Sequence, residues 1–111
     1  MPSRRLIARE TLDAGRVDFG DVATAAADAP VTPGEILREE FLLPLGLSAS
    51  RLAREIGVPT NRITAILAGT RAITAETALK LAVRLGTSAE FWMNLQTAHD
   101  LAVARASLRA A

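Results

Sequence analysis

The stretch Leu52–Gly69, LAREIGVPTNRITAILAG, decides the fold of this 111-residue chain. Its first part places three apolar residues on one side of a short helix, at Leu52, Ala53 and Ile56. Gly57 follows, where the end of a helix favours a residue that tolerates positive φ. Pro59 is well suited to the first position of a second helix. The stretch therefore predicts two short helices joined by a tight turn, with Val58 tucked into the core.

The second helix of this unit has an inward stripe in the i, i+3, i+4 spacing of an amphipathic helix, formed by Ile63, Ile66 and Leu67. Gly69 stands where that helix can end. Helix, glycine turn and short helix together form the helix-turn-helix pattern. We therefore interpret the rest of the chain as support, dimerisation surface or partner surface for this unit.

The composition favours an all-α fold. Half of the chain is apolar and only 4% is aromatic, and the abundance of Ala, Leu and Arg favours helix over sheet. Start and stop signals predict five helices and no strand, at about 33–43, 48–56, 59–68, 74–85 and 88–107.

Local signals set the ends and faces of these helices. Thr32 and Glu35 form a capping box at the first start, and Pro44 is expected to stop the first helix. We expect Leu45 and Leu47, in the connector that follows, to contact the core. The apolar faces of the fourth and fifth helices are expected to include Leu79, Phe91, Trp92 and Leu101.

The sequence argues against an enzyme. Without cysteine the chain has no disulfides and no thiolate metal sites, and its one histidine, His99, is interpreted as an exposed or interface residue. Glu39 and Glu40 are adjacent, so on a helix they point about 100° apart and do not converge. No glycine-rich phosphate loop is present. We expect no catalytic residue, no cofactor and no metal.

Residues 1–30 are expected to form an N-terminal arm, and residues 31–111 a helix-turn-helix domain with a C-terminal dimerisation helix. Large apolar side chains are sparse in the arm, which predicts flexibility; order on a partner, or packing on the domain, are the alternatives. No apolar run approaches the roughly 18 residues of a membrane span, and we expect no secretory signal at the N-terminus, because no apolar stretch follows Arg4 and Arg5. A cytoplasmic protein is expected.

The outward face of the second motif helix suits a DNA groove. If the stripe points inward, the opposite face carries Asn61, Ala65 and Ala68, with Thr64 beside them and Thr60 and Arg62 on the flanks. Asn61 can pair with an adenine edge, and Arg62 can reach a guanine edge or a phosphate. The small Ala65 permits close approach. The alternative is an ordinary solvated face in a helical bundle.

Positive charge is concentrated around this unit. Residues 51–84 hold six bases against two acids, whereas residues 1–30 have a net charge of −1. Arg51, Arg54 and Arg71 are candidates for phosphate contacts, which position a protein on DNA without specifying sequence. Solvated surface charge, or pairing of Arg54 with an acid, is the alternative.

The region from Val31 to Leu101 resembles the HigA-type antitoxins, a branch of the lambda-repressor-like (XRE) helix-turn-helix domains. The matching pieces are PGEILREEFLLPLGLS at 33–48, LAREIGV at 52–58, RITAILAGTRAIT at 62–74, TALKLAVRLGTSAEFWMNLQ at 77–96 and HDL at 99–101. The resemblance covers about 70 residues, and GTSAEFWMNLQ is its most specific part. It implies a five-helix domain that dimerises on a palindromic operator, represses its own operon, and neutralises a HigB-type, RelE-like mRNA interferase toxin.

The resemblance also places the DNA contacts. Thr60, Asn61 and Arg62 fall at the start of the recognition helix, and Ser48 and Ser50 at the start of the preceding helix, where this fold touches phosphate. Many relatives have Gln where this chain has Ala49, which removes one expected contact. The full expected DNA-binding set is Ser48, Ser50, Thr60, Asn61, Arg62, Thr64, Ala65 and Arg71.

Dimerisation is expected from geometry, because one such domain contacts a half-site and two half-sites lie about 34 Å apart. The expected surface lies on the last helix, at Leu101, Val103, Ala104 and Leu108; fraying of residues 103–111 is the alternative. A stand-alone regulator of the same fold without a toxin, and a bundle that binds only proteins, are the other functions considered.

Overall fold

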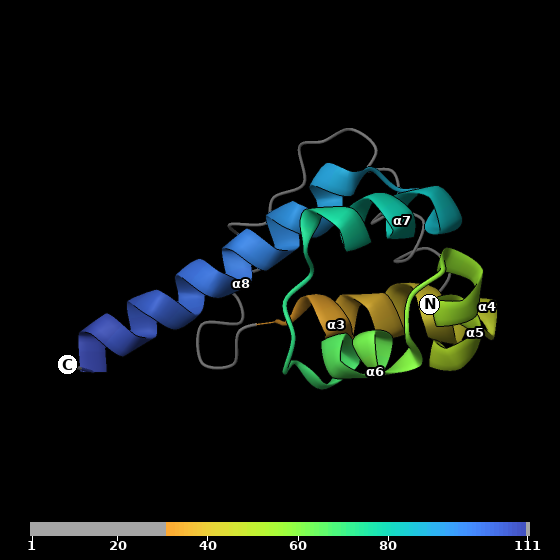
Figure 1. The fold of residues 1–111 in the computed structure, drawn as a ribbon. Coiled ribbons are helices and arrows are strands. Elements are labelled where there is room, and N and C mark those ends of the chain that lie inside the picture. The colour runs from red at the N-terminus through yellow and green to blue at the C-terminus, as the bar shows by residue number, and fades with distance from the viewer. Residues whose placement is uncertain (1–30, 111) are drawn as a thin grey trace.

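The computed structural model describes residues 31–110, and the predicted arm at residues 1–30 lies outside the described part. In chain order the elements are α3 (Pro33–Ile36), η1 (Leu37–Leu42), α4 (Leu43–Leu45), α5 (Ala49–Ile56), α6 (Thr60–Ala68), α7 (Ala75–Leu85) and α8 (Ala89–Ala110). Because α3, η1 and α4 follow one another without a break, the described residues form the five expected helices, with no strand among them (Figure 1).

The first helix begins as predicted. The Thr32 hydroxyl accepts a hydrogen bond from the Glu35 backbone N–H at 3.1 Å, and the Glu35 carboxylate accepts one from the Thr32 N–H at 2.9 Å. This reciprocal capping box gives side-chain acceptors to two backbone donors at the start of the helix. Pro33 occupies the first turn, where its missing N–H costs nothing.

The prediction that Pro44 stops this helix is wrong. Pro44 lies within α4, and the helix ends at Gly46, whose φ is +63°. The preceding segment η1 is a π-helix, in which the Leu43 N–H donates to the carbonyl of Arg38, five residues back. A proline disrupts a helix by removing the hydrogen bond to the carbonyl four residues back. Just before Pro44 the backbone already bonds five residues back, so this four-residue pattern is interrupted before the proline is reached.

The same extension explains a second error in this region. Leu45 is 51% exposed and makes no part of the core, because the helix continues through it and leaves its side chain on the outer face. Leu47, two residues later, is buried as predicted.

The core centres on an aromatic cluster that joins the first helix to α8. The ring centroids of Phe41 and Trp92 lie 5.3 Å apart, and those of Phe91 and Trp92 lie 4.7 Å apart in an edge-to-face arrangement. The Trp92 indole N–H donates to the Thr87 hydroxyl at 2.7 Å, so this buried polar group is satisfied. Phe91 and Trp92 are thus confirmed as core anchors.

Two residues assigned to apolar faces lie outside the core. Leu79 is 61% exposed, because the buried stripe of α7 runs through Ala78, Leu81 and Leu85 and Leu79 lies beside it. Leu101 is 46% exposed, because the later part of α8 extends beyond the other described helices (Figure 1).

A close backbone approach joins α3 to α6. A Cβ atom added at Gly34 would lie 2.0 Å from the carbonyl oxygen of Ile66 and 2.8 Å from the Cα of Leu67. Only glycine fits this contact. The Arg38 guanidinium donates to the Leu67 carbonyl at 3.4 Å from the same helix. The first helix therefore determines where the second helix of the 52–69 unit lies.

Candidate nucleic-acid interface

The α5–α6 unit is built as its apolar spacing predicts. Leu52, Ala53 and Ile63 are fully buried, and Ile66 is 2% exposed. Gly57 ends α5 with φ +75°, and the Val58 N–H donates to the Ala53 carbonyl at 2.9 Å, which closes the turn. Pro59 caps α6 in an extended conformation instead of filling its first position, so α6 begins one residue later than predicted.

The face of α6 opposite its buried stripe is open. Thr60, Asn61, Thr64 and Ala68 are exposed, and Arg62 and Ala65 are half-buried. This division between buried and exposed residues agrees with the face assigned from the sequence. The contacts of these residues with DNA remain a prediction.

Two of the polar side chains on this face are hydrogen-bonded or partly covered by the protein itself. The Thr64 hydroxyl donates to the Asn61 carbonyl at 3.3 Å, one turn back along the helix. The Nε atom of Arg62 is buried and has no hydrogen-bond partner among residues 31–110. Asn61 is exposed at the first turn of α6, where N–H groups without helical partners favour a negatively charged phosphate.

The start of α5 also faces solvent. The Ser48 hydroxyl caps this helix by accepting from the Arg51 N–H at 3.1 Å, and it lies 3.4 Å from the Ser50 hydroxyl. Ser48 therefore has a structural role in addition to any contact with DNA. Ser50 is exposed beside it.

An ion-pair network connects α5 to α7. Glu55 binds the Arg51 guanidinium at 3.0 Å and the Arg84 guanidinium at 2.5 Å through its two carboxylate oxygens. The hydrogen bond from Arg84, followed by that from Arg51, lowers the pKa of Glu55 below its ordinary value. Arg51 is thus partly neutralised. Arg54 forms no ion pair within residues 31–110, so the alternative that it pairs with an acid is not found in this part of the chain.

The loop after α6 carries Arg71, which is exposed. At one end, the Thr70 N–H and hydroxyl both donate to the Ala65 carbonyl, at 3.0 and 3.2 Å. At the other end, the Ile73 N–H donates to the side-chain oxygen of Gln96 at 2.8 Å, and this bond is buried. The loop is therefore fixed on both sides of Arg71.

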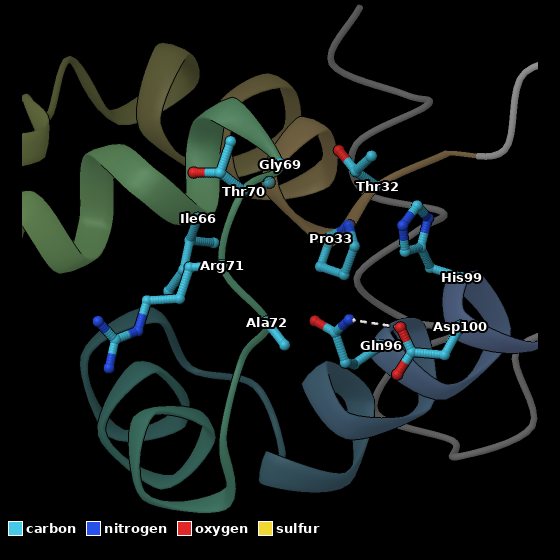
Figure 2. A pocket seen from close by; sticks show the side chains of 11 residues that line it. Thr32, Pro33, Ile66, Gly69, Thr70, Arg71, Ala72, Gln96, His99 and Asp100 are labelled. Atoms are coloured by element: carbon cyan, nitrogen blue, oxygen red, sulfur yellow. Dashed lines mark hydrogen bonds between the residues drawn. The ribbon is translucent and has the colours of Figure 1, made fainter. Parts of the chain in front are cut away.

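Sequence reasoning missed the role of Gln96. This glutamine is 8% exposed and donates from its nitrogen to the Asp100 carboxylate at 3.0 Å (Figure 2). The available signal was its position four residues after Trp92, on the inward face of an amphipathic helix. A polar residue at such a position needs a hydrogen-bond partner in the core.

A cavity of about 180 Å³ lies beside this glutamine. It is bounded by the start of α3, the loop at residues 69–72 and the α8 residues Gln96, His99 and Asp100 (Figure 2). His99 is half-buried, and its Nδ1 atom has no hydrogen-bond partner in the described part of the chain.

The four residues assigned to dimerisation are exposed on α8. Leu101 is 46% exposed, Val103 47% and Leu108 76%, and Ala104 is exposed as well. Because α8 is one continuous helix through Ala110 and successive residues turn by about 100°, Leu101, Ala104 and Leu108 share one side. Val103 lies on the opposite side, so a single flat contact cannot cover all four residues.

Residues 31–110 contain no group of three His, Asp or Glu side chains placed to hold a metal ion. Within the same residues, every helix is too short or too polar to cross a membrane.

These features define a helix-turn-helix domain with an exposed polar face on its second motif helix. A helix-turn-helix family model matches residues 37–92. Virulence-associated protein I of Dichelobacter nodosus is 51% identical over 74 residues, which cover 67% of this chain and 68% of that protein. Antitoxin HigA-1 of Vibrio cholerae is 44% identical over 72 residues, which cover 65% of this chain and 68% of that protein.

Among solved structures, the Pseudomonas aeruginosa antitoxin HigA with the higBA promoter superposes with a TM-score of 0.69 at 44% identity, covering 70% of this chain and 85% of that one. The chain belongs to the helix-turn-helix family, in its XRE branch of HigA-type antitoxins.

Proposed function

We propose that this chain is the antitoxin of a type II toxin–antitoxin module, which binds its operator as a homodimer, represses its own operon and neutralises a HigB/RelE-like mRNA interferase. The observation that carries the DNA-binding part is the exposed face of α6, which stands opposite the buried Ile63 and Ile66. The similar Pseudomonas aeruginosa HigA was solved with promoter DNA, which supports the same role here.

In this proposal α6 enters the major groove. Thr60, Asn61 and Arg62 contact base edges or the adjoining phosphates, and Ala65 allows the helix to approach closely. Thr64 lies beside Asn61 on the same open face. The groove contacts then supply the sequence preference.

Three further residues hold the DNA backbone. Ser48 and Ser50 lie at the start of α5 and Arg71 lies in the loop after α6, all of them exposed. Contacts of this kind fix the register of the protein on the duplex.

The homodimer forms through the projecting part of α8. Leu101, Ala104 and Leu108 form one apolar side of that helix. A twofold axis beside it would bring two α6 helices to successive half-sites, as a palindromic operator requires. Since Val103 lies on the opposite side of α8, it is not part of this contact.

Membership of the HigA-type branch supports the proposal of a toxin partner. A ribosome-dependent RNase must bind RNA and is therefore expected to be basic. The acidic excess of residues 1–30 suits such a partner. Residues 31–111 then form the DNA-binding and dimerisation domain.

Two measurements test this function. The full chain should retard a duplex of its own promoter in a gel shift. Half of that duplex should be bound at a lower protein concentration than half of an unrelated duplex of equal length. It should also co-purify with the product of the neighbouring gene and suppress the toxicity of that product.

Retardation of the promoter without a toxic neighbour identifies a stand-alone regulator. Failure to distinguish the promoter from the unrelated duplex excludes the repressor function. Toxin neutralisation is also compared between the full chain and a variant that lacks residues 1–30. Full protection by the truncated chain excludes a role of the N-terminal arm in neutralisation, and loss of protection supports one.

A further inference from the structure

We propose that Gln96 is a positioning residue for DNA binding, which holds the Arg71 loop in place through the Ile73 N–H and is itself oriented by Asp100. This inference rests on the proposed function, because it assigns Arg71 to a DNA phosphate. It adds a connection from α8, the helix proposed to dimerise, to the side of the domain that meets DNA.

The geometry of the loop carries the first step. Arg71 and Ala72 are exposed and lie between two anchors, the Thr70 bonds to the Ala65 carbonyl and the Ile73 bond to Gln96. The Ile73 side chain is 2% exposed, so the second anchor is buried with its surroundings. Without the Gln96 oxygen, the Ile73 N–H would be a buried donor without a partner, a costly arrangement that favours displacement of the loop.

The chemistry of the three groups fixes the orientation of the amide. A backbone N–H can only donate and a carboxylate can only accept, so the Gln96 oxygen must face Ile73 and its nitrogen must face Asp100. Figure 2 shows the bond between Gln96 and Asp100 beside the loop. Asp100 therefore keeps the acceptor directed at the loop, although it does not touch the loop through any of these bonds.

The consequence for DNA binding is preorganisation. An exposed arginine on a loop held at both ends meets a phosphate with less loss of conformational freedom than one on a free loop. Affinity falls as salt concentration rises, and each phosphate contact makes the slope of log affinity against log salt concentration more negative by about 0.9. Loss of the Gln96 anchor should therefore remove the part of the salt dependence that comes from Arg71. A general loss of stability would reduce the amount of folded protein but leave the salt dependence of its DNA binding unchanged.

The test is a double-mutant cycle on the full chain. Binding to the chain's own promoter duplex is measured by fluorescence anisotropy at several salt concentrations for Arg71→Ala, Gln96→Leu and their combination. We expect each single variant to make the salt dependence shallower by about 0.9, the share of one phosphate contact. The double variant should make it no shallower than either single variant. Gln96→Leu combined with Arg62→Ala should be additive, which serves as the matched control.

A reversed pair tests the amide orientation and covers the case in which Gln96→Leu fails to fold. Gln96→Glu places two carboxylates side by side and should weaken binding. Adding Asp100→Asn gives an acceptor at 96 facing a donor at 100 and should restore both the affinity and the slope. Additive effects of Arg71→Ala and Gln96→Leu, or no restoration by the reversed pair, would overturn the inference. If the wild-type chain does not bind its promoter, the proposed function fails first.

Discussion

Gly34 lies so close to Ile66 that a Cβ atom at position 34 would be 2.0 Å from the Ile66 carbonyl oxygen. This contact joins the first helix to the helix that carries the proposed base contacts. Because the opposing atom is backbone and not the end of a flexible side chain, α6 must move to admit any side chain at position 34.

We therefore expect Gly34→Ala to be strongly destabilising, at or above the upper end of the roughly 1–3 kcal/mol typical of overpacking. Urea unfolding followed by circular dichroism measures this. Gly57→Ala is the matched control: that site has open space but φ +75°, which costs about 1–2 kcal/mol. A Gly34→Ala variant that is more stable than Gly57→Ala would show that the helices do not pack this closely.

The proposed base contacts predict a loss of affinity on truncation. Asn61→Ala and Arg62→Ala should each weaken promoter binding by about 1–3 kcal/mol, since a good bidentate base contact contributes that amount. Asn94→Ala removes the same group as Asn61→Ala from an exposed position on α8 and should leave affinity within twofold. Titration by fluorescence anisotropy at one fixed salt concentration compares all three variants. Equal affinities across them would refute the assignment of α6 to the groove.

The division of α8 into two sides predicts different effects on self-association. Leu108→Glu places a charge beside Leu101 and Ala104 and should convert the proposed dimer to a monomer at micromolar concentration. Val103→Glu, on the opposite side, should leave the dimer intact. Light scattering after size-exclusion chromatography determines the mass of each variant. Dissociation by Val103→Glu alone would place the interface on the other side of the helix.

The Glu55 network predicts a dependence of stability on pH. Because the arginines lower the pKa of Glu55 in the folded chain, its contribution is fully present above the unfolded-state value and is lost as pH falls through the lower folded-state pKa. The gap in urea midpoint between the wild type and Glu55→Gln should thus be constant near neutral pH and close below about pH 4. A gap that persists unchanged at pH 2 would show that the carboxylate charge is not its origin.

Local periodicity and capping were sufficient to predict the α5–α6 unit and its faces. Leu52, Ile63 and Ile66 are buried and Asn61 and Thr64 are exposed, because each pattern is contained within one short helix. The errors arose where neighbouring structure determines the outcome. Pro44 continues a helix because a π-helical segment precedes it, and Leu101 is exposed because the core ends before it.

Two features of the site could not be derived from one sequence. The Gly34 contact depends on how α3 crosses α6, and the Gln96 bond depends on which loop passes α8. Both join residues more than twenty positions apart in the chain, and neither leaves a periodic pattern. The separation of Val103 from Leu101, in contrast, follows from helical geometry once α8 is known to continue to Ala110.

The length of α8 has a consequence for how the two proposed associations influence each other. The same unbroken helix carries the Gln96 anchor near its start and the Leu101–Leu108 side near its end. Two binding events that favour one shared arrangement strengthen each other by the same factor, by thermodynamic reciprocity. Promoter DNA should therefore lower the dimer dissociation constant of this chain as strongly as dimer formation tightens DNA binding. Operator occupancy would then rise more steeply than in direct proportion to the antitoxin concentration.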